Sequence, residues 1–228
     1  MVEKPIAINE KEILELIKLN EKCDTYIAEA MWTWFGSPLL TLDNAIKEKK
    51  FGDILEARFD FEILKPHFHK FDRLFDPNRA GGALMDLGIY LVTSSYKLFG
   101  EPLDIEVNSK IIKNIDVIDE IIFKYESFNL TMKTGFYKFK DQMFIKFGDG
   151  YIKLPSGHKP NKIVVHKKGK NYKFKGETSY LNKFVKVREE INSGSKVSSF
   201  ISLEDNLHIL RLMDKIRDKI HLQFPFEN

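Results

Sequence analysis

The stretch that most constrains the fold is residues 81–90, GGALMDLGIY, which opens an apolar segment that runs to about Phe99. Positions four apart share one face of a helix, so Asp86 and Tyr90 lie on one polar stripe. Apolar residues occupy nearly every other side, which predicts a buried helix whose stripe faces a partner, water or a cleft. Spacing alone leaves two interpretations open. Either the Tyr90 hydroxyl bonds Asp86 or backbone in a satisfied core pair, or Tyr90 is a catalytic acid/base with a supporting carboxylate.

Three short motifs occur in a fixed order along the chain: Glu3-Lys4-Pro5, residues 29–35 (EAMWTWF) and residues 73–90 (RLFDPNRAGGALMDLGIY). Together they resemble the glucose–fructose oxidoreductase/inositol dehydrogenase (Gfo/Idh/MocA) family. The branch that they resemble most contains dimeric dihydrodiol and xylose dehydrogenases, which have Tyr where inositol dehydrogenases have His. The similarity continues to the C-terminal helix.

The resemblance implies an enzyme in which NADP or NAD exchanges hydride with a secondary alcohol of a sugar, polyol or dihydrodiol. Tyr90 matches the family's general acid/base, Lys4 the lysine beside it, and Asp86 the supporting acid. Glu3, Lys4 and Pro5 match the cofactor-binding motif, in which the family favours a cis peptide bond before the proline. Free tyrosine has a pKa of about 10, and we expect the Lys4 ammonium to lower that pKa by stabilising the phenolate.

Further candidate residues come from the aromatic motif and the loop before the apolar helix. Trp32, Trp34 and Arg73 are candidate substrate-binding residues, although close relatives usually carry arginine where this chain has Trp34. His67 and His69 have the spacing of two ligands on one strand, but no third ligand is evident, so we expect no metal site.

The first 36 residues read as a single α/β unit. Asn9 followed by Glu12 predicts a helix that starts there and ends near Lys22, and Tyr26–Met31 reads as a short buried strand. By resemblance this unit is the C-terminal remnant of a dinucleotide-binding Rossmann domain, and no Gly-x-Gly-x-x-Gly motif accompanies it. We therefore expect the strand to expose unpaired edges, and residues 1–35 to open at lower cost than the rest.

Residues 37–228 read as an α+β substrate-binding and dimerisation domain. Ser37 and Pro38 read as the N-cap and first position of a helix. Residues 55–63 alternate between apolar and charged side chains, which predicts a strand with one wet face. Further strands are expected at 105–111, 120–125, 128–136, 143–147, 151–154, 163–166 and 172–175, and helices near 179–192 and 203–221. The expected architecture is an open, mostly antiparallel sheet with helices on one face.

Composition limits the classes of function. The chain is 43% hydrophobic and 30% charged, with a net charge of +3 that gives no argument for nucleic acid. The single Cys23 excludes an intrachain disulfide, and no apolar run approaches the roughly 18 residues of a membrane helix. These features predict a cytoplasmic protein, and the family implies a homodimer through the open sheet. The alternative to an enzyme is a non-catalytic dimerisation or scaffold remnant of the same family.

Overall fold

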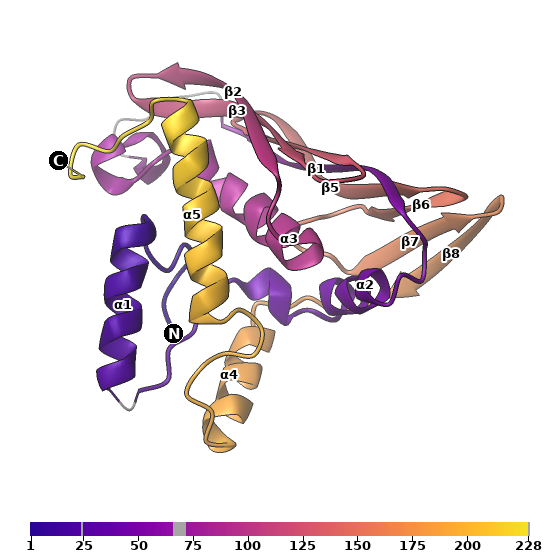
Figure 1. Cartoon of the computed structure of the whole chain (residues 1–228), viewed down its shortest axis with the longest axis horizontal. Helices are drawn as coiled ribbons and strands as arrows, with labels where there is room; N and C mark the ends of the chain where they lie inside the picture. Colours follow the sequence, from indigo (N-terminus) through magenta and orange to yellow (C-terminus); the bar gives the residue numbers. More distant parts are fainter. Residues whose placement is uncertain (24, 66–71, 228) are drawn as a thin grey trace.

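One open sheet organises the chain, whose computed structural model describes residues 1–23, 25–65 and 72–227. Within these residues eight strands lie in the order β2-β3-β4-β1-β5-β6-β7-β8 (Figure 1). All neighbours are antiparallel except β1 and β4, which pair in parallel. The strands are β1 (Ile54–Leu64), β2 (Asp104–Ile112), β3 (Ile115–Lys124), β4 (Asn129–Gly135), β5 (Tyr137–Phe147), β6 (Gly150–Leu154), β7 (Lys162–Lys167) and β8 (Lys170–Lys175). The expected α+β class is confirmed.

Helices cover one face of this sheet, and Figure 1 shows α3 running beneath the strands with α2 and α5 beside it. The helices are α1 (Glu10–Lys22), α2 (Ser37–Lys47), α3 (Ile89–Phe99), α4 (Asn182–Asn192) and α5 (Leu203–Lys219). Alternate strand residues such as Phe59, Met132 and Ile145 point to the covered face and are fully buried. Removing this apolar surface from water is the main stabilising contribution to the fold.

The charged face of β1 departs from the predicted wet face. Asp60 is 0% exposed and Glu62 is 4% exposed. Lys140 lies 3.0 Å from Asp60 Oδ2, Gln142 donates to the same oxygen at 3.0 Å, and Lys138 lies 3.3 Å from Glu62. The predicted wet face is confirmed at Arg58, whose side chain is 50% exposed. It was wrong for Asp60 and Glu62, because β1 is central and long side chains of β5 cover these two carboxylates. The homodimer through this sheet stays a prediction.

Helix α1 begins where the sequence predicts, since Asn9 accepts a hydrogen bond from the Glu12 N–H at 3.0 Å. Its apolar side packs against α5, and Ile13, Leu207 and Leu210 share a small core. Figure 1 shows the two helices side by side. The N-terminal unit is therefore anchored to the C-terminal helix.

The segment Tyr26–Met31 forms two isolated bridges and is not a sheet strand. Val2 pairs with Glu29, and Ile27 pairs with Val197. The buried residues of the segment are Ala28, Glu29, Ala30 and Met31. The expectation of exposed, unpaired edges was wrong, because the chain's own N-terminus and the segment before α5 supply partners. The domain boundary at residue 36 and the Rossmann origin of the first unit stay predictions.

Helix α2 also differs at its start. Gly36 is the N-cap, and Ser37 is the first helical residue. The Ser37 hydroxyl accepts a hydrogen bond from the Glu177 N–H at 3.1 Å, and the Ser37 N–H donates to the Glu177 carbonyl at 3.1 Å. Ser37 therefore joins α2 to the segment after β8 and leaves the helix without a side-chain cap.

Candidate active site

The helix with the Asp86/Tyr90 stripe starts with an irregular turn. A π-helical turn spans Leu84–Gly88 and leads into α3. Asp116 of β3 holds its beginning, because one carboxylate oxygen accepts the Leu84 N–H at 2.6 Å. Both Asp86 and Tyr90 then contact the same lysine side chain from the N-terminal motif.

Lys4 lies at the centre of the site. Its ammonium donates to the Asp86 carbonyl at 2.5 Å and to Asp86 Oδ1 at 3.2 Å, and it lies 4.7 Å from the centroid of the Tyr90 ring. The side chain is only 13% exposed. Burial lowers the pKa of Lys4, and the contacts with Asp86 offset only part of that effect. The peptide bond from Lys4 to Pro5 is cis, as the motif predicted.

Asp86 joins Lys4 to the rim of the site. Its Oδ1 atom also accepts a hydrogen bond from Arg73 Nη2 at 2.6 Å. The Arg73 side chain is 48% exposed. Asp86 therefore bridges a buried cation and an accessible one, and both were among the predicted site residues.

The Tyr90 hydroxyl accepts a hydrogen bond from Trp32 Nε1 at 3.0 Å. Among the described residues this hydroxyl has no acceptor of its own, so its proton is free to bind a ligand oxygen. Burial raises the pKa of Tyr90 to about 12, and the Trp32 hydrogen bond opposes this only in part. The expected lowering of that pKa by Lys4 was wrong, because burial of the phenol dominates.

The two tryptophans of the aromatic motif face different surroundings. Both lie on the 3₁₀ turn Trp32–Phe35, where residues two apart point in different directions. Both belong to the main hydrophobic core, but Trp32 Nε1 donates to the Tyr90 hydroxyl, whereas the Trp34 side chain is 1% exposed and makes no contact with Tyr90 that we observe among the described residues. The burial of Trp34 gives no support to substrate binding there, and that role stays a prediction.

Glu3 points away from its neighbour Lys4. Its carboxylate lies 3.3 Å from the Lys183 ammonium and accepts a hydrogen bond from the Tyr180 hydroxyl at 3.3 Å. The Lys183 ammonium also lies 3.7 Å from the centroid of the Tyr180 ring. Glu3 thus contacts the segment around α4, whereas Lys4 contacts the turn that leads into α3.

The sequence did not single out His158 and Asp141, which lie beside Tyr90. The His158 and Phe61 rings are stacked at 4.3 Å, and the centroids of the His158 and Tyr90 rings are 6.2 Å apart. His158 Nδ1 lies 2.6 Å from Asp141 Oδ2. One signal was available, since Asp141 is in phase with the inward-facing Met143 of the same strand.

Glu29, the first residue of the aromatic motif, is a second buried acid near the site. One carboxylate oxygen accepts the Ile6 N–H at 3.1 Å, and the other has no partner among the described residues. Burial raises the pKa of Glu29 to about 7, although the Ile6 N–H and Lys4 act in the opposite direction. Such a group charges near neutral pH, next to the Lys4 ammonium.

We expect the Glu29→Gln variant to change how stability depends on pH. Folding raises the pKa of Glu29 from 4.5 to about 7, so the protonated carboxyl group stabilises the folded state. This stabilisation is fully present below pH 4.5 and is lost as the pH rises through about 7. The wild-type chain loses about 3 kcal/mol of unfolding free energy relative to Glu29→Gln over that window. Urea unfolding at pH 4.5, 6 and 8 measures this difference. If the unfolding free energies of the two proteins changed equally with pH, the raised pKa of Glu29 would be contradicted.

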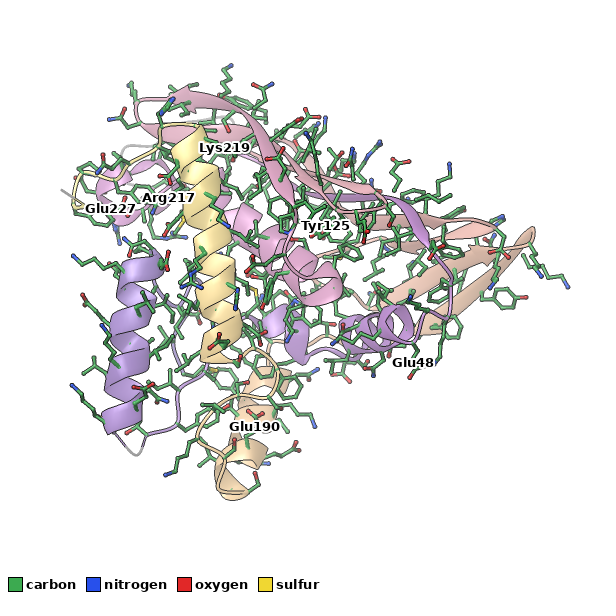
Figure 2. The ribbon with its side chains drawn as sticks, in the orientation of Figure 1. Glu48, Tyr125, Glu190, Arg217, Lys219 and Glu227 are labelled. Atoms are coloured by element: carbon green, nitrogen blue, oxygen red, sulfur yellow. The ribbon has the colours of Figure 1, made fainter. Side chains whose placement is uncertain are left out.

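Two other features lie away from this site. His67 and His69 fall outside the described residues, and within the described ranges no group of three His, Cys, Asp or Glu side chains is placed to hold a metal. A groove of about 1040 Å³ lies between α1 and the C-terminal end of α5. Figure 2 shows Arg217 and Glu227 together at its edge, and their side chains are 2.6 Å apart. Of the helices described, none is long and apolar enough to cross a bilayer.

Comparison with known proteins bears on the whole chain. Residues 39–137 match the GFO/IDH/MocA C-terminal domain. A trans-1,2-dihydrobenzene-1,2-diol dehydrogenase from Mus musculus is 24% identical over 242 residues, which cover 99% of this chain and 71% of that protein. The Homo sapiens protein of the same name is 32% identical over 100 residues, 44% of this chain and 29% of its own length.

Solved structures share the fold at lower identity. An aldose-aldose oxidoreductase from Caulobacter crescentus, complexed with glycerol, superposes with a TM-score of 0.83 at 16% identity, covering 96% of this chain and 69% of that one. A 3-ketoreductase from Actinomadura kijaniata, in complex with TDP-benzene and NADP, gives a TM-score of 0.78 at 15% identity, with coverage of 94% and 68%. The resemblance drawn from the three motifs is confirmed: residues 39–137 match the C-terminal domain of the Gfo/Idh/MocA family, and the relatives that the chain matches are named dehydrogenases and oxidoreductases.

Proposed function

We propose that this chain is the catalytic and substrate-binding part of an NAD(P)-dependent oxidoreductase that interconverts a secondary alcohol and a ketone on a sugar, polyol or dihydrodiol. The observation that carries the proposal is the convergence of Lys4, Asp86, Tyr90 and Trp32 from three separate segments. The names of the relatives support the substrate class, since they include a dihydrodiol dehydrogenase and an aldose-aldose oxidoreductase.

The residues present fit the nicotinamide end of the cofactor. An ammonium has three N–H donors, and two of those of Lys4 bind Asp86, which leaves one for a cofactor or substrate hydroxyl. When bound, the nicotinamide supplies or accepts the hydride. The sequence carries no Gly-x-Gly-x-x-Gly motif for the pyrophosphate, and its residues do not distinguish NAD from NADP.

Tyr90 exchanges the proton that accompanies this reaction. Trp32 occupies an acceptor position on the Tyr90 oxygen, so the hydroxyl proton points to another acceptor. A substrate carbonyl placed there receives this proton as it is reduced, and the alcohol returns it in the opposite direction. Because its pKa is about 12, Tyr90 is a proton donor at neutral pH, which suits ketone reduction.

The role of Lys4 is tested by removing its charge. The assay measures NADPH or NADH oxidation with ketose and α-hydroxy ketone substrates, in this chain joined at residue 1 to a dinucleotide-binding half. We expect Lys4→Met to lower kcat/KM about 100-fold, because the variant loses both the ammonium beside Tyr90 and the contact that orients Asp86.

Lys97→Met is the matched control. Lys97 is a similarly buried lysine on α3, and its ammonium lies 3.2 Å from Asp205. We expect this control to keep kcat/KM within about threefold of wild type, because Lys97 contacts α5 and not Tyr90. Equal losses in the two variants would contradict a catalytic role for Lys4. Absence of any turnover in the joined wild-type protein would favour the non-catalytic scaffold alternative.

A further inference from the structure

A histidine–aspartate pair lies next to Tyr90 and is held by several hydrogen bonds. The Asp141 carboxylate accepts hydrogen bonds from the Ser156 hydroxyl at 2.5 Å, from the Gly157 N–H at 2.7 Å and from the His158 N–H at 3.1 Å. His158 Nδ1 lies 2.6 Å from the same carboxylate. Burial raises the pKa of Asp141, but the hydrogen bonds from His158 and Ser156 outweigh it, so the net pKa is lowered.

This contact fixes the tautomer of the imidazole. An ionised carboxylate only accepts hydrogen bonds, so Nδ1 of His158 carries the proton that binds Asp141. In the neutral ring Nε2 is then a hydrogen-bond acceptor. Nε2 has no hydrogen-bond partner among the described residues. The His158 side chain is 28% exposed and that of Asp141 is 5% exposed, so the imidazole is the accessible end of the pair.

The imidazole lies among the aromatic rings of the active site. It is stacked on Phe61, and its centroid lies 5.8 Å from that of Trp32 and 6.2 Å from that of Tyr90. Thr33 donates to the His158 carbonyl at 2.8 Å and ties the loop to the turn that holds Trp32. The turn that holds Trp32 therefore contacts both Tyr90 and the loop that carries His158, and this fixes the two side chains relative to each other.

We propose that His158 Nε2 accepts a hydrogen bond from a substrate hydroxyl on the carbon next to the one that reacts, with Asp141 as the residue that positions the ring. A hydroxyl at that carbon is present in a vicinal diol and in its oxidised form, the α-hydroxy ketone. A simple secondary alcohol lacks the group that His158 binds. The inference rests on the proposed function, because it takes the Tyr90 hydroxyl as the group that faces the reacting oxygen.

The test measures binding and not turnover, so that it is independent of hydride transfer. The probes are trans-1,2-cyclohexanediol and cyclohexanol, titrated into the full chain and followed by NMR. We expect the diol to bind about tenfold more tightly than the mono-alcohol, as one additional hydrogen bond predicts. His158→Asn keeps an N–H near the position of Nδ1 for Asp141 but has no atom at Nε2, and we expect it to remove this preference.

Two further variants separate the proposal from a structural role. His166→Asn is the matched control, because His166 is also stacked on an aromatic ring and bound through Nδ1, to Asn171 at 2.9 Å. We expect it to keep the preference for the diol. Asp141→Asn presents an N–H to Nδ1, moves the ring proton to Nε2 and removes the acceptor, and long-range ¹⁵N spectra of the ring detect that change of tautomer.

Each outcome decides the proposal. Loss of the diol preference in His158→Asn and Asp141→Asn, with unchanged thermal unfolding in His158→Asn, supports it. An unchanged preference in His158→Asn overturns it, as does failure of the wild-type chain to bind the diol at about 100 mM. A chain that prefers the diol but shows no hydride transfer once joined to a dinucleotide-binding half would contradict the proposed function and leave this binding role intact.

Discussion

A Tyr90→Phe variant is expected to lose about two to four powers of ten in kcat/KM for ketone reduction, in the chain joined to a dinucleotide-binding half. The substitution keeps the ring that packs against Phe61 and beneath Lys4 and removes only the hydroxyl group. The expected loss is large because no other described hydroxyl accepts the Trp32 N–H and lies free to donate a proton. Tyr96→Phe on the same helix is the control, since the Tyr96 ring stacks on His208 outside the site.

The pKa of Tyr90 predicts how kcat/KM for reduction and for oxidation depends on pH. With a pKa of about 12, Tyr90 keeps its proton throughout the working range, so its ionisation leaves reductive kcat/KM level below about pH 10. Oxidation needs the phenolate, and its kcat/KM rises about tenfold per pH unit over the same range. Initial rates of reduction and oxidation between about pH 6 and 10, where the protein is expected to stay folded, measure both dependences. A reductive rate that falls with an apparent pKa near 7 in the Glu29→Gln background, where that carboxyl group cannot titrate, would contradict the assignment.

A Gly82→Ala variant is expected to lose about 4 kcal/mol of unfolding free energy. Gly82 has a φ of +123°, and a methyl group there would lie 1.9 Å from Asp116 Oδ1. Asp116 is fully buried and cannot move aside without releasing the Leu84 N–H that starts the helix. Backbone strain at residue 82 and steric overlap with Asp116 therefore both destabilise the turn that leads into the helix.

Gly148→Ala is the matched control for this substitution. A methyl group at Gly148 would have no neighbour within 4 Å, and its backbone is not in the left-handed region. We expect its unfolding free energy to stay within about 0.5 kcal/mol of wild type. Chemical denaturation with a common m-value measures both variants. A loss at Gly82 no greater than that at Gly148 would show that the turn relaxes.

The elements of the sheet follow from local pattern, whereas the burial of particular charges does not. Alternation in β1 predicted the strand, but the fate of Asp60 depends on the neighbours of β1, and these are β4 and β5 from distant parts of the sequence. No spacing within residues 54–64 contains that information. Burial of the charged face is therefore a property of topology.

The candidate site was predicted by motif resemblance more than by spacing. Lys4, Asp86 and Tyr90 are separated in the sequence, and only the three motifs in order indicated that they meet. His158 was not found, because its loop carries no motif and its place depends on the carboxylate of Asp141. The pKa of Tyr90 also could not be predicted, since it depends on how completely the helix is covered.

The position of β1 in the sheet has a consequence for the order in which the chain folds. Strands β2, β3 and β4 form one meander, strands β5 to β8 form another, and within the described residues β1 is the strand that joins them. Ala57 pairs with both Leu130 and Ile145, so β1 finds its partners only after most of the chain has been synthesised. Contacts between such distant residues form slowly, whereas hairpins between successive strands form fast. During synthesis on the ribosome, β1 is therefore complete before either meander has formed. Its pairing with β4 and β5 is the step that joins the two meanders into one sheet.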